Sequence, residues 1–371
     1  MGRFARIILG VLLAGVLSMF LPRDIGRELR LVAAWTHRPE AVGSSALDAA
    51  IDRDSLSDLM VLVAGTRWSA VRARDGRALR SGVRTAHFTA STDGYVNQPD
   101  VARSWAVQGW DGSVLGIVPR QGLPVLEDSV LAQFTADGVL AATDIARGAR
   151  TQVRMPAEPS VYALDAREGG APLVAVGSVH GELAVARAGD AWTHRFRHRR
   201  FTEASSAIYA IDILPSSSRD LLILHGRNPQ QLSRVVLGAA GEVRAELVTS
   251  LEGSEQVAWP TNIDASDPDL LAVGLNRSVL IIDRESGTLR RVPIPGSDIL
   301  WGTRDGPVGT VMVGAGSDRE SILVLVSADF SPLATWRFTG SGIAALPPDR
   351  GQAMMVLELD DGGFIALEAR L

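Results

Sequence analysis

The sequence contains no cysteine and no lysine, and both absences narrow what the chain can do. Without cysteine it has no disulfide bond, no thiolate zinc site, no cysteine nucleophile and no lipid attached through a cysteine. Because exported and cytosolic proteins can both lack cysteine, this absence does not indicate the cellular compartment of the protein. All 37 basic residues are arginine, which we attribute to a bias in codon use. The net charge of −5 argues against general nucleic-acid binding, which needs a basic surface.

Metal-binding patterns are also missing from the sequence. The six histidines show neither the His-x-His nor the His-Glu-x-x-His spacing. His194 and His198 lie four residues apart, but in a strand-like segment, where this spacing does not form a metal pair. Asp52, Asp54 and Asp58 lack the glycine and the terminal glutamate of a calcium loop. The sequence therefore predicts no metal site.

Two glycine-rich stretches resemble catalytic or cofactor motifs only superficially. Residues 177–181 place a serine inside a predicted hairpin, whereas a nucleophile elbow joins a strand to a helix. Residues 314–317 lie between two predicted strands, and we expect a plain loop there because a dinucleotide site needs a following helix. The sequence therefore assigns no catalytic and no cofactor-binding residue, and no cofactor is expected.

What the chain does contain is apolar sequence interrupted by many turns. Its 371 residues are enough for one large or two ordinary domains with ample core. Apolar residues make up 46% and the mean hydropathy is +0.13, which excludes a disordered protein. The 37 glycines and 18 prolines supply the turns that an all-β chain needs.

The N-terminal residues 1–23 predict a membrane anchor. Arg3 and Arg6 precede residues 7–21, a run without charge whose length lies between a signal-peptide core and a minimal spanning helix. Because no good small-x-small cleavage site follows, we favour an uncleaved signal anchor over a cleaved peptide. Arginines flank both ends of the run, so the positive-inside rule is nearly balanced. We expect a single pass through a bacterial inner membrane, with the rest of the chain in the periplasm or outside.

Short apolar runs bounded by turn residues recur along most of the chain. Residues 270–292 are the clearest copy, with three predicted strands separated by Asn276-Arg277 and by residues 285–287. Asp-Gly pairs between apolar runs, the strongest short signal of a β-hairpin, occur at 111–112 and 137–138. Further hairpins start near residues 59, 173, 220, 310 and 353, and extra apolar strands precede several of them, at 160–165, 207–214, 256–265 and 342–346.

These copies predict a unit of four antiparallel strands, about 40 to 50 residues long, which is the pattern of a β-propeller blade. The hairpins at 103–119 and 129–146 are too closely spaced for this unit, so we expect either a blade that lacks a strand or an inserted hairpin there. The fold class is therefore all-β, a single propeller over residues 46–371 with eight blades favoured over seven. Residues 24–45 are a linker, and its apolar residues 30–35 are expected to complete the last blade, which ends after three strands.

Several copies resemble the repeat of the PQQ-type propellers, which typically reads G-x-L-x-A-L-D-x-x-T-G-x-x-x-W. Residues 181–185 (GELAV), residues 278–289 (SVLIIDRESGTL) and residues 161–165 (VYALD) are similar to it, with Trp192 and Trp336 near the tryptophan position. The resemblance extends to the broad class of WD40-like and quinoprotein-like propellers. It implies the fold and little about activity, because that class includes enzymes, assembly scaffolds and sensors.

One stretch departs from the acidic character of the chain. Residues 194–200 contain four arginines and two histidines, which alternation would place on one face of a strand with Phe196 on the other. We consider two interpretations: a solvated edge strand protected by charge, or a patch that docks an acidic partner, glycan or lipid headgroup. The residues of this candidate patch are His194, Arg195, Arg197, His198, Arg199 and Arg200.

The sequence favours a non-catalytic scaffold, anchored in the membrane, that binds protein partners outside the cytoplasm. The alternative is a propeller enzyme, such as a quinoprotein-like dehydrogenase or a hydrolase, with its site in the central funnel. No nucleic-acid partner is expected, and a small-molecule ligand stays open.

Overall fold

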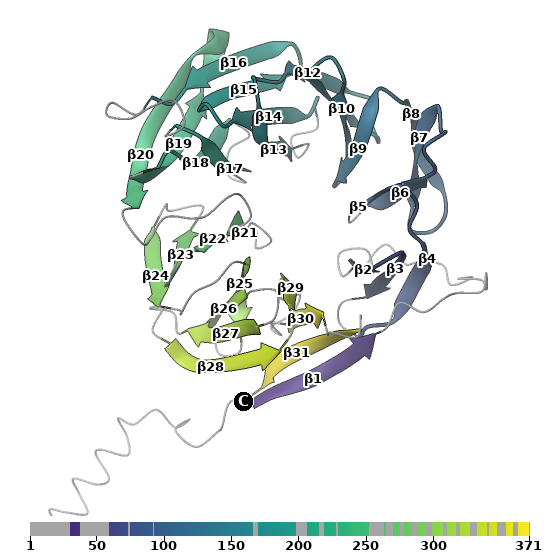
Figure 1. Ribbon diagram of the computed structural model, residues 1–371, viewed down its shortest axis with the longest axis vertical. Helices are drawn as coiled ribbons and strands as arrows, with labels where there is room; N and C mark the ends of the chain where they lie inside the picture. Colours follow the sequence, from purple (N-terminus) through teal and green to yellow (C-terminus); the bar gives the residue numbers. More distant parts are fainter. Residues whose placement is uncertain are drawn as a thin grey trace, which may run out of the picture.

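The computed structural model shows a ring of β-sheets around a common centre (Figure 1). It describes residues 30–37, 59–72, 75–91, 93–165, 170–197, 206–214, 219–227, 229–251, 263–264, 270–274, 278–283, 288–293, 299–306, 310–316, 320–326, 332–339, 341–346, 354–358 and 363–370. Within these residues the strands form eight separate antiparallel sheets, seven with four strands and one with three. The prediction of an all-β chain is confirmed.

The sheets follow one another around the ring in chain order. The three-stranded sheet contains β2 (Leu59–Ala64), β3 (Arg67–Arg72) and β4 (Ala78–Val83). The next contains β5 (His87–Ala90), β6 (Gly94–Gln98), β7 (Ser104–Gly109) and β8 (Val114–Pro119). It is followed by β9 (Gly122–Glu127), β10 (Val130–Thr135), β11 (Val139–Asp144) and β12 (Arg150–Arg154). The fourth contains β13 (Pro159–Asp165), β14 (Leu173–Ser178), β15 (Glu182–Arg187) and β16 (Asp190–Arg195).

The second half of the ring repeats the same order. It begins with β17 (Ile208–Ile213), β18 (Asp220–His225), β19 (Gln230–Leu237) and β20 (Val243–Leu251), with a 3-10 helix, η3 (Ala239–Gly241), between the last two. Then come β21 (Ile263–Asp264), β22 (Leu270–Gly274), β23 (Ser278–Asp283) and β24 (Leu289–Pro293). The next sheet contains β25 (Ile299–Gly306), β26 (Thr310–Gly316), β27 (Glu320–Val326) and β28 (Pro332–Thr339).

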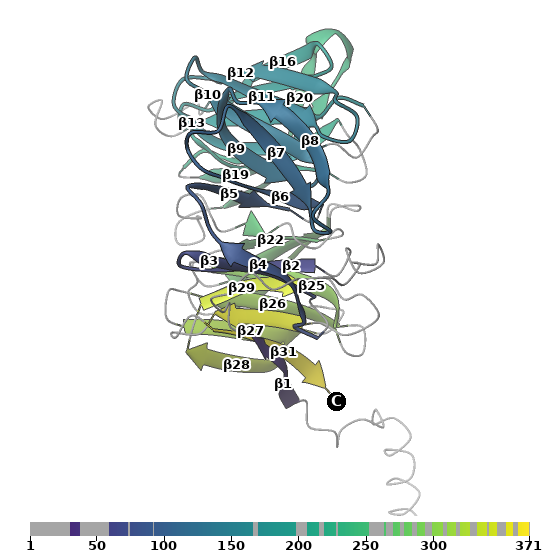
Figure 2. The ribbon, with the colours of Figure 1, turned by 90° about the vertical axis from the view of Figure 1, so that its right-hand side faces the viewer.

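The last sheet joins the two ends of the ring. β29 (Ser341–Leu346), β30 (Met354–Glu358) and β31 (Phe364–Arg370) supply three strands, and β1 (Arg30–His37) pairs antiparallel with β31 as the fourth. The register runs from Arg30 opposite Arg370 to His37 opposite Phe364, with a bulge between Ala33 and Trp35. Seen from the side, β1 and β31 lie together at one edge of the ring (Figure 2). Residues distant in sequence therefore share one sheet.

The irregular spacing near residues 103–146 has a different cause from the two that we expected. Residues 87–119 and residues 122–154 each hold four paired strands, so neither a lost strand nor an inserted hairpin occurs there. The first hairpin joins the third and fourth strands of its sheet, and the second joins the second and third strands of the next. The spacing looked short because the two hairpins occupy different places in the repeat, and because these units are shorter than predicted.

Within the glycine-rich stretch, residues 314–316 belong to a strand rather than to a plain loop. Gly314 and Gly316 lie inside β26, and Gly314 is paired with Trp301 on one side and Leu323 on the other. Glycine accepts an extended backbone as readily as a turn, so glycine content alone did not mark the end of this strand.

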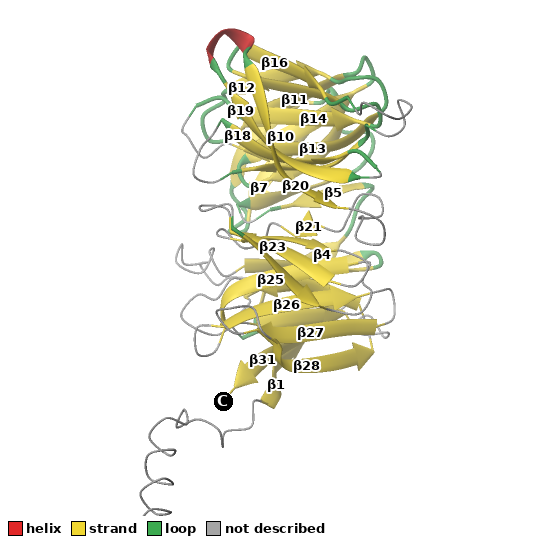
Figure 3. Ribbon diagram, turned by 90° about the vertical axis from the view of Figure 1, so that its left-hand side faces the viewer, coloured by secondary structure: helices red, strands yellow, loops and turns green. Residues whose placement is uncertain are grey.

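Strands dominate the described residues, as Figure 3 shows.

The core lies between neighbouring sheets rather than inside one of them. Val107 and Val118 pack against Leu126 and Leu131 of the next sheet. Because both faces of each sheet are covered in this way, a strand such as β14 is buried along its whole length. Hydrophobic burial between the sheets thus holds the ring together.

Antiparallel pairing sends the loops of each sheet alternately to two faces of the ring. We call the turn face the one formed by the turns between first and second and between third and fourth strands, such as residues 91–93, 110–113, 128–129 and 145–149. The connector face is formed by the loops between second and third strands and by the connections to the next sheet, such as residues 99–103, 120–121 and 136–138.

The predicted anchor, residues 1–23, and the linker residues 38–45 lie outside the described part of the chain. Within the part that is described, no helix is long and apolar enough to cross a membrane.

Candidate partner-binding face

Polar side chains fix the backbone of the connector face between β4 and β7. The Thr85 N–H donates to Asn97 Oδ1 at 2.8 Å, and the Thr85 hydroxyl donates to the Gln98 carbonyl at 2.9 Å. Asn97 Nδ2 donates in turn to the Val83 carbonyl at 3.0 Å. Asparagine and threonine favour such local bonds to loop backbone, so this segment is held without regular pairing.

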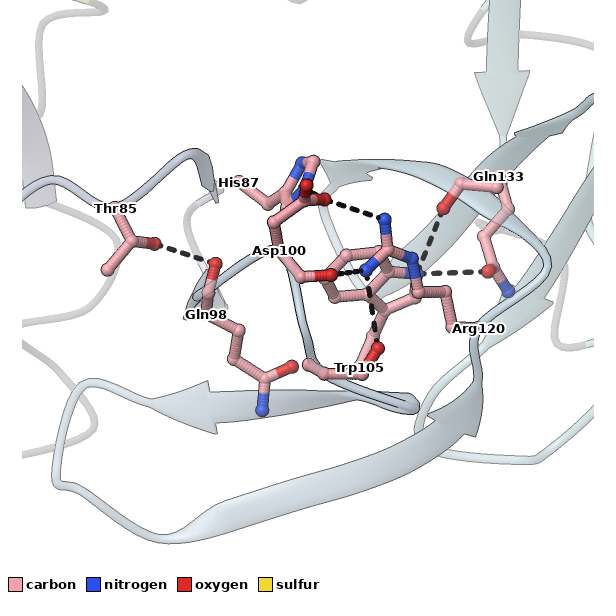
Figure 4. A network of polar contacts seen from close by, with 9 residues as sticks. Thr85, His87, Gln98, Asp100, Trp105, Arg120 and Gln133 are labelled. Atoms are coloured by element: carbon pink, nitrogen blue, oxygen red, sulfur yellow. Dashed lines mark hydrogen bonds and ion pairs between the residues drawn. The ribbon is translucent and has the colours of Figure 1, made fainter.

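Asp100 joins a histidine and an arginine on the same face (Figure 4). Its Oδ1 lies 2.8 Å from His87 Nε2 and 3.0 Å from Arg120 Nη2. Hydrogen bonds from His87 and then from Arg120 hold the pKa of this exposed carboxyl below its usual range. Arg120 also donates to the carbonyls of Asp100 and Ala102, the latter at 3.3 Å. The 99–103 loop is thereby tied to the connection that leads into the next sheet.

Trp105 and Gln133 carry this network across to the next sheet. The Arg120 guanidinium lies 4.8 Å from the centre of the Trp105 ring, which is fully buried. Trp105 Nε1 donates to Gln133 Oε1 at 3.0 Å, and Gln133 Nε2 donates to the Pro119 carbonyl at 3.1 Å. The Gln121 N–H also donates to Gln133 Oε1, at 2.7 Å. Because the polar groups of this network are bonded to partners in the chain, the network fixes the positions of these loops.

This fixed frame presents apolar side chains to solvent. Val83, Val101 and Leu123 are exposed by 68%, 86% and 57%. Arg103 and Arg120 share with Leu123 a depression of about 590 Å³ that opens on this face. It is lined by Arg103, Arg120, Gln121, Gly122, Leu123, Phe134, Thr135 and Ala136. Apolar side chains mixed with arginine on fixed loops are the composition of protein-binding surfaces.

The structure divides the basic stretch that the sequence singled out. Arg195 ends β16 and is exposed, 3.8 Å from Glu182, and Arg197 is exposed on the connector face beyond the strand. His194 faces the apolar side instead, with its ring 4.7 Å from that of Phe196, and burial lowers its pKa. His194 is therefore separated from the basic surface. His198, Arg199 and Arg200 lie outside the described residues, as do Asp52, Asp54 and Asp58.

A second group of ionisable side chains lies on the inner strands of the ring. Glu127 ends β9, with Asp128 beside it, and Tyr162 and Asp165 belong to β13 of the next sheet. Glu127 keeps a solvent-exposed surface but is surrounded by protein, and this desolvation, with repulsion from Asp128 and Asp165, raises its pKa to about 7. Desolvation and Glu127 also raise the pKa of Tyr162. Within the described residues no three metal-ligating side chains come together.

Sequence reasoning missed the exposed residues of the connector face and Glu127. A usable signal existed for Val101, an apolar residue in a polar loop just after Pro99-Asp100. The neighbouring Asp128 is visible in the sequence, but the desolvation of Glu127 and its proximity to Asp165 of the next sheet arise only in the fold.

Comparisons with known proteins agree with this architecture. No family model matches the sequence, and no curated protein matches it. Among solved structures, BamB from Moraxella catarrhalis has 13% identity and a TM-score of 0.55, over 91% of this chain and 100% of that chain. The computationally designed Ika8 protein has 15% identity and a TM-score of 0.52, over 86% and 94%. A eukaryotic initiation factor has 11% identity and a TM-score of 0.50, over 90% of both chains.

The fold is a β-propeller. Each four-stranded sheet of the described residues has the form of a blade, and the connector and turn faces are the two ends of the propeller. At these levels of identity the likenesses establish the fold, and the function has to be argued from the surface of this propeller.

Proposed function

We propose that this protein is a non-catalytic scaffold that binds protein partners through its connector face. The observation that carries the proposal is the exposure of Val101 on a loop fixed by the Asp100–Arg120 network, with Val83 and Leu123 exposed at strand ends of the same face and Arg103 and Arg120 in the depression beside Leu123. Arginine is enriched among the residues that carry most of the binding energy of protein interfaces, and exposed apolar side chains gain from leaving water on binding. Loops that are already ordered lose little conformational entropy on binding, which favours affinity.

The remaining features of the proposal come from the sequence. Residues 1–23 would anchor the propeller in the inner membrane, facing the periplasm or exterior. We also propose an eight-bladed ring built from PQQ-like repeats and closed by β1. The candidate patch of His194, Arg195, Arg197, His198, Arg199 and Arg200 would add a basic docking area on the same face, with His194 supporting the strand through Phe196.

In-cell crosslinking followed by identification of the captured protein tests the scaffold. We expect Val101→Ser with Leu123→Ser to abolish capture, because the double change removes two apolar anchors without touching the polar network. The matched control is Leu247→Ser on β20, which removes an apolar side chain that is 59% exposed on another strand. Equal capture by all three proteins would contradict the proposal.

The same crosslinking experiment also tests the candidate patch. Replacing Arg195, Arg197, Arg199 and Arg200 by serine is expected to weaken capture. Unchanged capture would remove the patch from the binding surface.

One observation favours the second candidate, an enzyme with its site at the centre of the ring. A carboxyl with a pKa of about 7, such as Glu127, is suited to proton transfer near neutral pH, and Tyr162 lies close enough to be influenced by it. If no partner is captured and the purified protein binds a small molecule that Glu127→Gln no longer binds, the enzyme replaces the scaffold.

A further inference from the structure

The outermost strand β8 presents apolar residues to solvent. Val114 is 58% exposed, Leu115 43% and Ile117 66%. No described strand pairs with the outer edge of β8, which lies at the periphery of the ring (Figure 1). Its outward N–H and C=O groups are therefore available to another chain, except at Pro119, which has no N–H.

The other outermost strands differ from β8 in one respect. Each of them, among the strands described, contains at least one charged residue: β1 Arg30, β4 Arg80, β12 Arg150 and Arg154, β16 Asp190 and Arg195, β20 Arg244 and Glu246, β24 Arg290 and Arg291, and β28 Arg337. Charged side chains on an edge strand oppose pairing with a second chain. β8 reads VLGIVP and has no such protection.

A bulge turns one side chain of β8 toward the next blade. The register of β8 against β7 shifts between Val107 and Gln108, so Leu115 has no partner opposite it. Leu115 lies over Gly94 and Gly109, where an added Cβ would meet its methyl groups at 3.2 and 3.3 Å. It thereby forms a wall of a pocket of about 390 Å³ between this blade and Ile145 and Ala146 of the next. The pocket therefore adjoins the first residues of β8, where its unpaired outer edge starts.

The rest of this pocket is acidic. Asp93, Asp111 and Asp128 line it, and no basic residue does. Asp111 accepts hydrogen bonds from the Ser113 hydroxyl and N–H at 2.6 and 2.9 Å, and Arg80 lies near it. Asp93 and Asp128 form no ion pair within the described residues. Burial and the charge of Asp128 raise the pKa of Asp93, so a cation between these two carboxylates would be stabilised.

The backbone holds the two carboxylates in neighbouring turns. The Ser91 hydroxyl donates to the Asp128 carbonyl at 2.7 Å, which joins the turns of two blades. Asp128 adopts a φ of 46°, a left-handed conformation that aspartate tolerates better than most residues in tight turns. The geometry of this turn places Asp128 beside the pocket.

We propose that the outer edge of β8 binds an extended segment of a partner protein as an added strand, with an arginine or lysine of that segment in the adjoining acidic pocket. A side chain opposite Ser113 or Leu115 on an added strand lies on the pocket side of the sheet. The apolar wall of Leu115 and Ile145 suits the aliphatic stem of a long basic side chain, and the carboxylates suit its charge. Backbone pairing supplies affinity, and the pocket supplies selectivity.

Pairing of β8 with β8 of a second copy of this chain would not supply the basic side chain. β8 itself has no basic residue, and Arg120, which follows it, is engaged by Asp100 and Trp105. The proposed site is on the turn face and the periphery, away from Val101 and Leu123, so it does not depend on the scaffold function of the connector face.

Binding of a labelled synthetic peptide to the full-length protein tests the site. The probe alternates valine and threonine and begins with arginine, and its matched control begins with glutamine. We expect Ile117→Lys to weaken binding of the arginine peptide at least about tenfold, because the new charge protects the edge. Asp93→Asn with Asp128→Asn should leave the glutamine peptide unaffected and remove the preference for arginine.

The control variant is Leu247→Lys, which adds the same charge to an exposed apolar position of β20 and should bind like the unmodified protein. Equal binding by the Ile117→Lys variant, or an equal loss in Leu247→Lys, would overturn the proposal. So would self-association in sedimentation that Ile117→Lys abolishes, because a second copy would then occupy the edge. Val101→Ser with Leu123→Ser should leave peptide binding unchanged, which separates this site from the connector face.

Discussion

Gln133 joins two blades by using both ends of its side-chain amide. The oxygen accepts from Trp105 and Gln121, the nitrogen donates to the Pro119 carbonyl, and the side chain is only 1% exposed. A buried amide with this many partners is costly to replace, because its partners keep their polar groups in a site without water.

Gln133→Leu is therefore expected to lower the free energy of unfolding by about 1–3 kcal/mol. The leucine would fit the space but leave the Gln121 N–H and the Pro119 carbonyl without their partner. Chemical denaturation measures the difference. Gln152→Leu, at an exposed position of β12, is the control and should change stability by less than about 0.5 kcal/mol. Equal stability of both variants would show that the network contributes nothing.

Glu127 predicts a pH dependence of stability. Its pKa in the folded chain is about 7, above the usual value of 4.5, so between these values the folded state holds a proton that the unfolded state has released. Stability therefore falls as the pH rises through this window, and the loss is complete above about pH 7. We expect Glu127→Gln to flatten this part of the profile and to be more stable than the unmodified protein above it. Thermal unfolding across the window checks this, and parallel profiles would refute it.

At the scale of single strands, burial decided which elements the sequence revealed. β10, β11, β14 and β18 are apolar and buried along most of their length, and their apolar runs predicted them. β5, β6, β9, β12 and β25 were missed. β12 alternates buried and exposed residues, β9 contains Pro124 and β6 ends in Asn97 and Gln98, so none of these three forms a continuous apolar run.

The pairing of β1 with β31 offers an element-scale test, because the chain has no cysteine to compete with an introduced pair. Thr36 and Ile365 face each other in the register. Thr36→Cys with Ile365→Cys should form a disulfide on oxidation and raise the free energy of unfolding by about 2–4 kcal/mol. Mass spectrometry and denaturation measure the two effects.

The control pair for this test is Thr36→Cys with Ala369→Cys. These positions are about 13 Å apart along the strand at 3.3 Å per residue, too far for a disulfide. Equally efficient crosslinking of both pairs would mean that β1 does not hold this register.

For the whole molecule, the sequence predicts that residues 1–23 anchor the protein in a membrane. We expect the full chain to sediment with membranes and to resist extraction by alkaline carbonate, and a variant lacking residues 1–23 to remain in the supernatant. The reason is the uncharged run of residues 7–21, which is apolar on every face. A purified protein whose sequence begins after residue 23 would instead support the cleaved signal peptide.

The sequence by itself determined the local geometry of the repeat. The Asp-Gly and His-Gly turns at Gly112, Gly138 and Gly181 have φ of 87°, 79° and 78°, a region open to glycine, and apolar runs on either side supply paired strands. Local steric preference is enough to form these turns and burial is enough to form these strands, so both could be predicted from neighbouring residues.

Only the tertiary structure decided which loops meet. Trp105 with Gln133, and Asp93 with Asp128, are brought together by the stacking of blades, and Asp100 meets Arg120 through the pairing of strands within one blade. Stacking also leaves β8 as an uncharged edge beside an acidic pocket, whereas the separation of His194 from Arg195 follows from the alternation of side chains along β16. Such contacts depend on where whole sheets pack against each other, and no short stretch of sequence contains that information.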